Sequence, residues 1–296
     1  MILVTTPTGH IGGQVLDSLL DAGEAAGEIR VIVRDPARLS PYVRARVDVV
    51  PGSHADPDVA AKACAGADRV FWLVPPTPAA RSVAGHFRAF TGPLVEAVVN
   101  QDVERVVAVS TLGRGVAEHA GQISASLAMD DVIRATGVHY RALCPPYLME
   151  NLLHLAVSIR DEGVITMAAP GDQVLRTCAT RDIGVTAARL LLDGSWTGQD
   201  DIPLVGPDEL TPEGMAAVVS AVLDRPVAFR EISGAEYKAT LMRYGASEDW
   251  AQGLADLAAA TTGQGFYGSM APSTPHTAPT SLRRWCEEVL KPAVLC

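Results

Sequence analysis

The feature that most constrains this chain is a regular alternation of short apolar runs with helical segments through its first half. The opening residues, MILVTTPTGHIGGQVLDSLLDAG, contain an unbroken apolar run, a glycine-rich turn and apolar residues at helical spacing. Further apolar runs follow in EIRVIVRDPARL, VDVVPG, DRVFWLVPP, VERVVAVSTLG and VHYRALCPPYL, with helical segments between several of them. Strand–helix units of this length predict an α/β fold with a doubly wound parallel sheet, covered by helices on both faces.

The carboxyl ends of the predicted strands indicate where a ligand would bind. In a doubly wound sheet, ligands lie in the crevice beyond these ends. The corresponding residues here are Thr5–Gly12, Arg34, Leu73–Pro76, Ser110–Gly113 and Cys144–Tyr147. We therefore expect them, Pro75 and Pro145 included, to surround one cleft.

The first glycine-rich turn is typical of a dinucleotide-binding site. Gly9 allows a tight turn, Gly12 allows the helix to lie close to the strand, and free N–H groups at the helix start favour a pyrophosphate. Thr6 stands where the first glycine of the motif is usual, so it must adopt a conformation that glycine normally supplies. The alternative is a strand–helix turn that binds nothing.

The end of the second strand predicts which dinucleotide is preferred. Arg34 closes this strand, where NAD-specific sites usually carry an acidic residue, and Arg38 follows one helical turn later. A guanidinium group suits a 2′-phosphate, which favours NADPH. Asp35 leaves some room for NAD, and a solvated Arg-Asp turn is the alternative interpretation.

Composition narrows the possible partners. The 296 residues carry a formal net charge of −10, which argues against a nucleic-acid partner. No apolar run approaches the ~20 residues of a membrane span. The five cysteines form no paired motif, and the histidines show no metal-ligand spacing. We expect a soluble, cytoplasmic protein without a bound metal or a membrane partner.

Five segments resemble the NmrA-like branch of the atypical short-chain dehydrogenases/reductases. They are ILVTTPTGHIGGQVL, VIVRDPARL, GVHYRALCPPYLMENLL, ATRDIGVTAARLLLDG and PLVGPDELTPEGMAAVVSAVLDRPVAFREIS, in family order. The resemblance implies a Rossmann-type NAD(P)-binding domain over residues 1–150 and a smaller C-terminal α/β substrate lobe over 151–296. Residues of about 175–193 are expected to pack back onto the first domain. Residues 200–233 are expected to form a strand, a helix capped by Thr211 and a second strand of the lobe.

The same resemblance assigns the cofactor site. It implies cofactor contacts for Thr8, Gly9, His10, Ile11, Gly12 and Arg34, with Pro75 and Ser110 near the ribose and nicotinamide; Arg38 and Pro145 join them by their place in the sequence. Besides Thr6, the chain departs from the family at Ser53 and His54, where an acidic residue near the adenine is frequent.

Catalysis by the usual pair of these reductases is excluded. A tyrosine normally donates the proton, its pKa lowered by a lysine four residues later. The three lysines, Lys62, Lys238 and Lys291, follow no tyrosine at that spacing, and the matching positions hold Gln122 and Ser126. Ser110 and Tyr147 are the remaining weak candidates, with capping of a turn and simple packing as their alternative roles.

Two classes of function are compatible with these residues. The first is an NADPH-dependent reductase of a quinone, or of a ketone in a polycyclic aromatic, polyketide-like small molecule. Its proton would come from the substrate or from solvent. The second is a non-catalytic NADP(H)-binding redox sensor that acts through a protein partner. The apolar residues that follow Tyr147 favour the enzyme.

Overall fold

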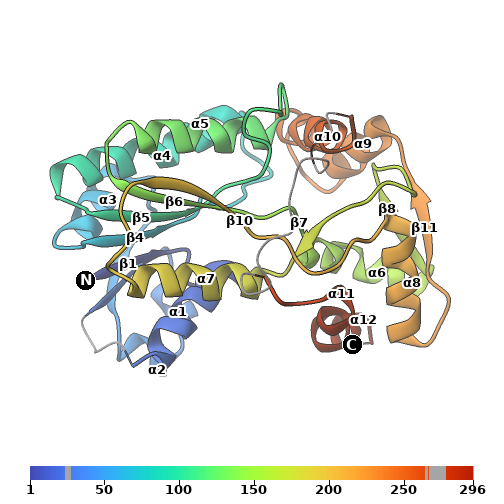
Figure 1. Cartoon of the computed structure of the whole chain (residues 1–296), viewed down its shortest axis with the longest axis horizontal. Helices are drawn as coiled ribbons and strands as arrows, with labels where there is room; N and C mark the ends of the chain where they lie inside the picture. The colour runs from blue at the N-terminus through green and yellow to red at the C-terminus, as the bar shows by residue number, and fades with distance from the viewer. Residues whose placement is uncertain (24–27, 264–265, 267–277, 296) are drawn as a thin grey trace.

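A seven-stranded parallel sheet forms the centre of the larger part of the molecule (Figure 1). The computed structural model describes residues 1–23, 28–263, 266 and 278–295. The strand order is β10-β6-β5-β4-β1-β2-β3. Their bounds are β1 Ile2–Thr5, β2 Ile29–Val33, β3 Asp48–Pro51, β4 Arg69–Trp72, β5 Arg105–Val109, β6 His139–Cys144 and β10 Gln199–Pro203. The chain reverses its direction of progress through the sheet between β1 and β4, which places the crevice beside the glycine turn.

Helices cover both faces of this sheet because successive strand residues point to opposite sides. On one face lie α1 (His10–Asp21) and α7 (Thr180–Leu192), which pack with Val4 of β1. On the other lie α3 (Pro57–Cys64), α4 (Val83–Asn100) and α5 (Gln122–Arg134), packed with Leu3. The Rossmann-type, doubly wound fold predicted from the sequence is thus confirmed (Figure 1).

A smaller lobe lies beyond the carboxyl ends of the strands (Figure 1). Its core is formed around β8 (Val164–Met167) and β11 (Ala228–Glu231), which pair in parallel. Around it are η2 (Met149–Leu155), α6 (Ala156–Asp161), α8 (Pro212–Leu223), α11 (Leu282–Trp285), η3 (Cys286–Leu290) and α12 (Lys291–Leu295). Helix α8 begins as expected, with the Thr211 hydroxyl accepting a 3.0 Å hydrogen bond from the Gly214 N–H.

One expectation about this lobe is wrong. The residues from Asp200 onward were assigned to the lobe as its first strand, but β10 adds to the main sheet as its edge. It pairs in parallel with β6 along its whole length, from Gln199 opposite Tyr140 to Pro203 opposite Cys144. The ladder places β10 beside β6 because α7, which precedes it, packs against α1 beneath the sheet.

The two parts of the chain are joined at several points. Glu150 accepts hydrogen bonds from the Trp285 indole at 2.9 Å and from the Thr180 N–H at 3.0 Å, which ties the C-terminal helices to the start of α7. Strands β7 (Tyr147–Leu148) and β9 (Thr177–Cys178) pair between the sheet and the lobe. Helices α9 (Gly234–Arg243) and α10 (Glu248–Gly263) turn back over the start of α4 and α5 (Figure 1).

No helix among the described residues is both long and apolar enough to cross a membrane. The four cysteines in the described part of the chain are buried as free thiols, and burial raises the pKa of the Cys64 thiol to about 11.

Candidate cofactor and substrate site

The turn between β1 and α1 takes its sharp bend at Thr6. This residue has a φ of 52°, in the left-handed region that β-branched side chains rarely adopt. The Thr6 carbonyl accepts a 3.0 Å hydrogen bond from the Gly9 N–H, which closes the turn. Gly9 itself has a φ of −92°, so the tight bend assigned to Gly9 in the sequence is made by Thr6 instead. The replacement of glycine therefore keeps the backbone shape and adds strain.

Gly12 is the position in this turn that no other residue can fill. A Cβ atom there would lie 2.2 Å from the Thr6 carbonyl oxygen and 2.9 Å from that of Thr5. These are backbone atoms of β1 and its turn, which cannot move aside. The predicted role of Gly12, to let the helix start against the strand, is confirmed.

The start of α1 offers donors to an anion. Gly9 is its N-cap residue, no side chain caps the helix, and the first turn contains no acidic residue. The Thr6 Oγ1 atom is buried without a hydrogen-bond partner among the described residues. Exposed backbone N–H groups and an orphaned buried hydroxyl fit a dinucleotide pyrophosphate at this helix terminus.

The other predicted residues of the turn differ in exposure. Thr8 is half-buried and His10 is exposed, whereas the Ile11 side chain packs between α1 and the sheet. Ile11 and Gly12 can therefore contribute only backbone groups to a ligand.

The end of β2 presents two arginines and no available acid. Asp35 is the N-cap of the short helix η1 (Pro36–Arg38), where its carboxylate accepts a 2.9 Å hydrogen bond from the Ala37 N–H. Arg34 and Arg38 are exposed, and neither forms an ion pair with another residue that the structure describes. Asp35 uses one carboxylate oxygen in the helix cap, and the exposed guanidinium groups beside it suit a 2′-phosphate.

His54 is buried at the site where the family resemblance places the adenine. Its Nε2 atom lies 3.0 Å from the Leu73 carbonyl oxygen, and its ring contacts those of Trp72 and Phe90. Its pKa is lowered to about 4, mainly by burial and to a smaller extent by the nearby Arg34 charge, against the hydrogen bond to Leu73, which raises it. His54 is therefore neutral at neutral pH and holds the loop that follows β4.

A second histidine holds the same loop from the other side. The His86 Nε2 atom of α4 lies 2.8 Å from the carbonyl oxygen of Pro75. The Phe90 ring lies between the two imidazoles, with centroids 4.6 Å from His54 and 4.8 Å from His86. Pro75, predicted to lie near the ribose, thus sits on a segment held by two part-buried histidine contacts.

Ser110 follows the end of β5, and its hydroxyl is drawn into the protein. It donates a 2.6 Å hydrogen bond to Asp130 of α5, and Ser126 Oγ lies 3.5 Å away. Ser126 thus faces the strand end from α5, whereas the Gln122 side chain bonds to the Trp250 carbonyl of α10. Asp130 is the group that sequence reasoning missed.

The remaining two predicted residues lie beside the small lobe. Pro145 is buried after the end of β6, and Tyr147 begins β7. The Tyr147 side chain packs against the apolar core of the lobe, and its backbone N–H bonds to the Arg176 carbonyl. Tyr147 therefore forms part of the connection between the sheet and the lobe.

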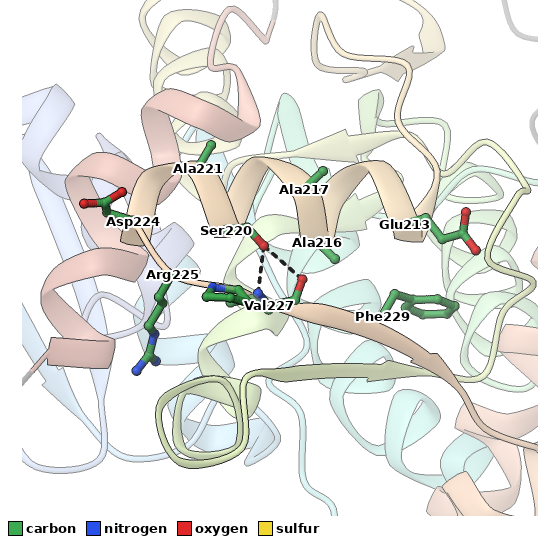
Figure 2. Close-up of a pocket in the computed structure, with 10 residues that line it drawn as sticks. Glu213, Ala216, Ala217, Ser220, Ala221, Asp224, Arg225, Val227 and Phe229 are labelled. Atoms are coloured by element: carbon green, nitrogen blue, oxygen red, sulfur yellow. Dashed lines mark hydrogen bonds between the residues drawn. The ribbon is translucent and has the colours of Figure 1, made fainter.

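A hollow between α8 and β11 lies elsewhere on the described surface. Figure 2 shows Ser220 turned toward Val227, with Glu213 and Phe229 at one end and Asp224 at the other. The Ser220 hydroxyl is already bonded to the carbonyl and the N–H of Val227. This hollow is separate from the strand ends and does not form part of the cofactor site.

Comparison with known proteins agrees with this geometry. Residues 7–182 match the NAD(P)H-binding family. The chain is 28% identical to the prestalk A differentiation protein A of Dictyostelium discoideum over 266 residues, 86% of this chain and 80% of that protein. It is 30% identical to the (4-alkanoyl-5-oxo-2,5-dihydrofuran-3-yl)methyl phosphate reductase of Streptomyces griseus over 250 residues, 82% of this chain and 80% of that protein.

A solved structure shows the same fold over almost the whole chain. It is the NADPH-dependent quinone oxidoreductase of Escherichia coli in complex with NADPH. The TM-score is 0.81 at 21% identity, and the match covers 98% of this chain and 99% of that one.

Proposed function

Because the chain belongs to the NAD(P)H-binding family, in the NmrA-like branch of the atypical short-chain dehydrogenases/reductases, we propose that it is an NADPH-dependent reductase of quinones. Its general class, an NAD(P)H-dependent oxidoreductase, is that of the Streptomyces and Escherichia coli relatives. The proposal concerns the preferred coenzyme, the acceptor and the origin of the proton.

The observation that carries the choice of acceptor is the lack of the tyrosine–lysine pair on α5. The turn at Thr6 and the exposed Arg34 suit NADPH, yet Gln122 and Ser126 occupy the positions of the proton-donating pair. A reduced simple ketone leaves an alkoxide, which needs such a donor. A reduced quinone leaves a phenolate, whose pKa resembles the ~10 of tyrosine and which water can protonate. A ring ketone flanked by a phenol satisfies the same requirement, because the phenol supplies the proton.

The residues of this chain then act mainly by binding and positioning. The N–H groups at the start of α1 hold the pyrophosphate, and Arg34 and Arg38 hold the 2′-phosphate. The loop fixed by His54 and His86 supports the coenzyme beside the strand ends. When bound, the reduced nicotinamide supplies the hydride. Orientation of an acceptor against it can contribute several kcal/mol, on the order of what well-placed intramolecular reactions gain.

The test is a panel of acceptors mixed with the protein and NADPH, followed by the absorbance of the reduced nicotinamide. The panel holds quinones, ring ketones with an adjacent phenol, the methyl ethers of those phenols and simple ketones. We expect turnover with quinones and with the free phenols, and a large loss with the methyl ethers. Tight NADPH binding without oxidation by any acceptor would contradict the proposal and support a redox sensor acting through a protein partner.

A further inference from the structure

Asp130 is a fully buried carboxylate that accepts hydrogen bonds from three side chains. It lies on α5, one turn beyond Ser126, and is 0% exposed. Its Oδ2 atom accepts from the Ser110 hydroxyl at 2.6 Å and from Arg114 Nη2 at 3.1 Å. Its Oδ1 atom accepts from the Tyr140 hydroxyl of β6 at 2.6 Å. These contacts connect the end of β5 to the interior of the sheet.

The three donors favour the ionised form of the Asp130 carboxyl. Arg114 can only donate, and both hydroxyls can donate at their observed distances, so the arrangement suits an ionised carboxylate. Burial raises the pKa of the Asp130 carboxyl above its usual range, and the hydrogen bonds from Ser110 and Tyr140, together with the Arg114 charge, oppose that rise. A buried carboxylate without these donors would be costly to ionise.

The network settles the direction in which Ser110 can bond. A serine hydroxyl has one hydrogen and two lone pairs, and in this structure the hydrogen is committed to Asp130. The Ser126 hydroxyl, 3.5 Å from Ser110, is at the outer limit of a hydrogen bond and uses one lone pair at most. Ser110 stands just after β5, with 8% of the residue exposed, and the described contacts leave at least one lone pair of its hydroxyl oxygen unused.

We propose that Asp130 is a positioning residue that holds Ser110 as a hydrogen-bond acceptor, so that Ser110 recognises an O–H or N–H donor of the bound reactants. This inference rests on the proposed function and deepens it. An acceptor at this position cannot stabilise a developing oxyanion. It instead selects hydroxylated quinones, whose hydroxyl hydrogen is not needed by the reduced carbonyl, over acceptors that lack a donor.

Two groups of the reacting complex carry such a donor: the phenolic O–H of the substrate and the carboxamide N–H of the nicotinamide. The same acceptor chemistry would serve either. Removing one donor at a time distinguishes the two possibilities. The methyl ether of the substrate phenol lacks the O–H donor, and the 3-acetylpyridine analogue of NADPH lacks the carboxamide N–H donor.

The decisive variant is Asp130→Ala. Alanine removes the acceptor of the Ser110 hydroxyl, which frees the Ser110 hydrogen to be donated to a ligand, so that Ser110 is no longer held as an acceptor. We expect the ratio of kcat/KM for a hydroxyquinone over its methyl ether to fall by about tenfold or more, the size of one lost hydrogen bond to a buried group. If the carboxamide is the donor, the ratio for NADPH over its acetylpyridine analogue falls instead.

Tyr140→Phe is the matched control. It removes another hydroxyl from the same carboxylate without touching Ser110, so both ratios should stay within about twofold of wild type. Ser110→Ala should lose the same preference as Asp130→Ala, and Ser110→Thr should retain it. These two variants keep the inference testable if Asp130→Ala does not fold, which a thermal melt would show.

Binding measurements separate this inference from the proposed function. Dissociation constants for the hydroxylated and methylated ligands, and for the two oxidised coenzymes, need no turnover. A wild-type preference for the donor-bearing ligand that disappears in Ser110→Ala supports the inference even if no acceptor is reduced. Equal affinities in the wild type, or a preference unchanged in Ser110→Ala, would overturn the inference. Neither result would bear on whether the protein oxidises NADPH.

Discussion

The strain at Thr6 should reverse the usual order of stability between a glycine and an alanine variant at this position. At an ordinary φ, glycine is less stable than alanine by ~0.4–1 kcal/mol, because glycine loses more freedom on folding. At the Thr6 φ of 52°, an L-residue with a Cβ atom costs about 1–2 kcal/mol more than glycine. The free energy of unfolding of Thr6→Gly should therefore exceed that of Thr6→Ala, by roughly 0.5–1 kcal/mol.

The stability of either variant relative to the wild type also depends on the loss of the Thr6 hydroxyl and methyl groups. Both variants lose the buried Thr6 Oγ1, which lacks a partner and costs ~1–3 kcal/mol, and both lose a methyl contact of ~0.8 kcal/mol. Thr6→Gly should then be roughly 1–3 kcal/mol more stable than the wild type in the absence of coenzyme. If the Thr6 hydroxyl hydrogen-bonds to the pyrophosphate, NADPH should stabilise the wild type more than Thr6→Gly and so reduce this difference in stability.

The assay is urea denaturation with and without NADPH. Thr8 supplies the control, because it lies in the same turn and is not among the residues with positive φ. Thr8→Gly should be less stable than Thr8→Ala. The reasoning about Thr6 fails if Thr6→Ala is as stable as Thr6→Gly, or if both positions rank the two substitutions alike.

The other predictions concern the coenzyme, the acid and a buried histidine. Arg34→Ala should weaken NADPH binding by about 1.5–3 kcal/mol and leave NADH binding nearly unchanged in a calorimetric titration; equal losses for both coenzymes would reject the 2′-phosphate contact. Tyr147→Phe and Ser110→Ala should each lower kcat less than ~100-fold, and abolished turnover with intact coenzyme binding would reveal an acid in the protein. His54, with its pKa lowered from 6.5 to about 4, stays neutral when folded, so stability is lost as the pH falls through this range. Between pH 7.5 and 5 this loss is about 2 kcal/mol, and His54→Gln, which keeps a donor but does not titrate, should lack it in denaturant unfolding at the two pH values.

Much of the fold could be predicted because its signals are local. The run Met1–Val4 and the helix that follows Gly9 have apolar patterns that only a buried strand and an amphipathic helix satisfy. The backbone strain at Thr6 and the close approach at Gly12 were likewise predictable, because a tight turn before a helix requires both.

Strand β10 was misassigned because its residues carry no such signal. An edge strand pairs with a neighbour along only one of its two edges, and the residues QDDIP are polar and largely exposed. Its place beside β6 depends on the docking of α7, which is a tertiary contact that no local pattern records.

Asp130 escaped the sequence analysis for a related reason. It is adjacent to Asp131 in α5, and the pair resembles an ordinary solvated helix face, yet Asp130 is buried whereas Asp131 is exposed. Its burial depends on Tyr140 of β6 and on Ser110, which directly follows β5. The spacing of Asp130 four residues after Ser126, on the face that meets the strand ends, is the one signal that could have identified it.

The central claim is that the bound coenzyme gives up its hydride in this protein. The most direct measurement is a single turnover under anaerobic conditions, in which the protein saturated with NADPH is mixed with excess quinone. The account predicts a complete loss of the absorbance of the reduced nicotinamide, slowed when the transferred hydrogen of the coenzyme is deuterium. An absorbance that persists with every quinone, while NADPH remains bound, would contradict it.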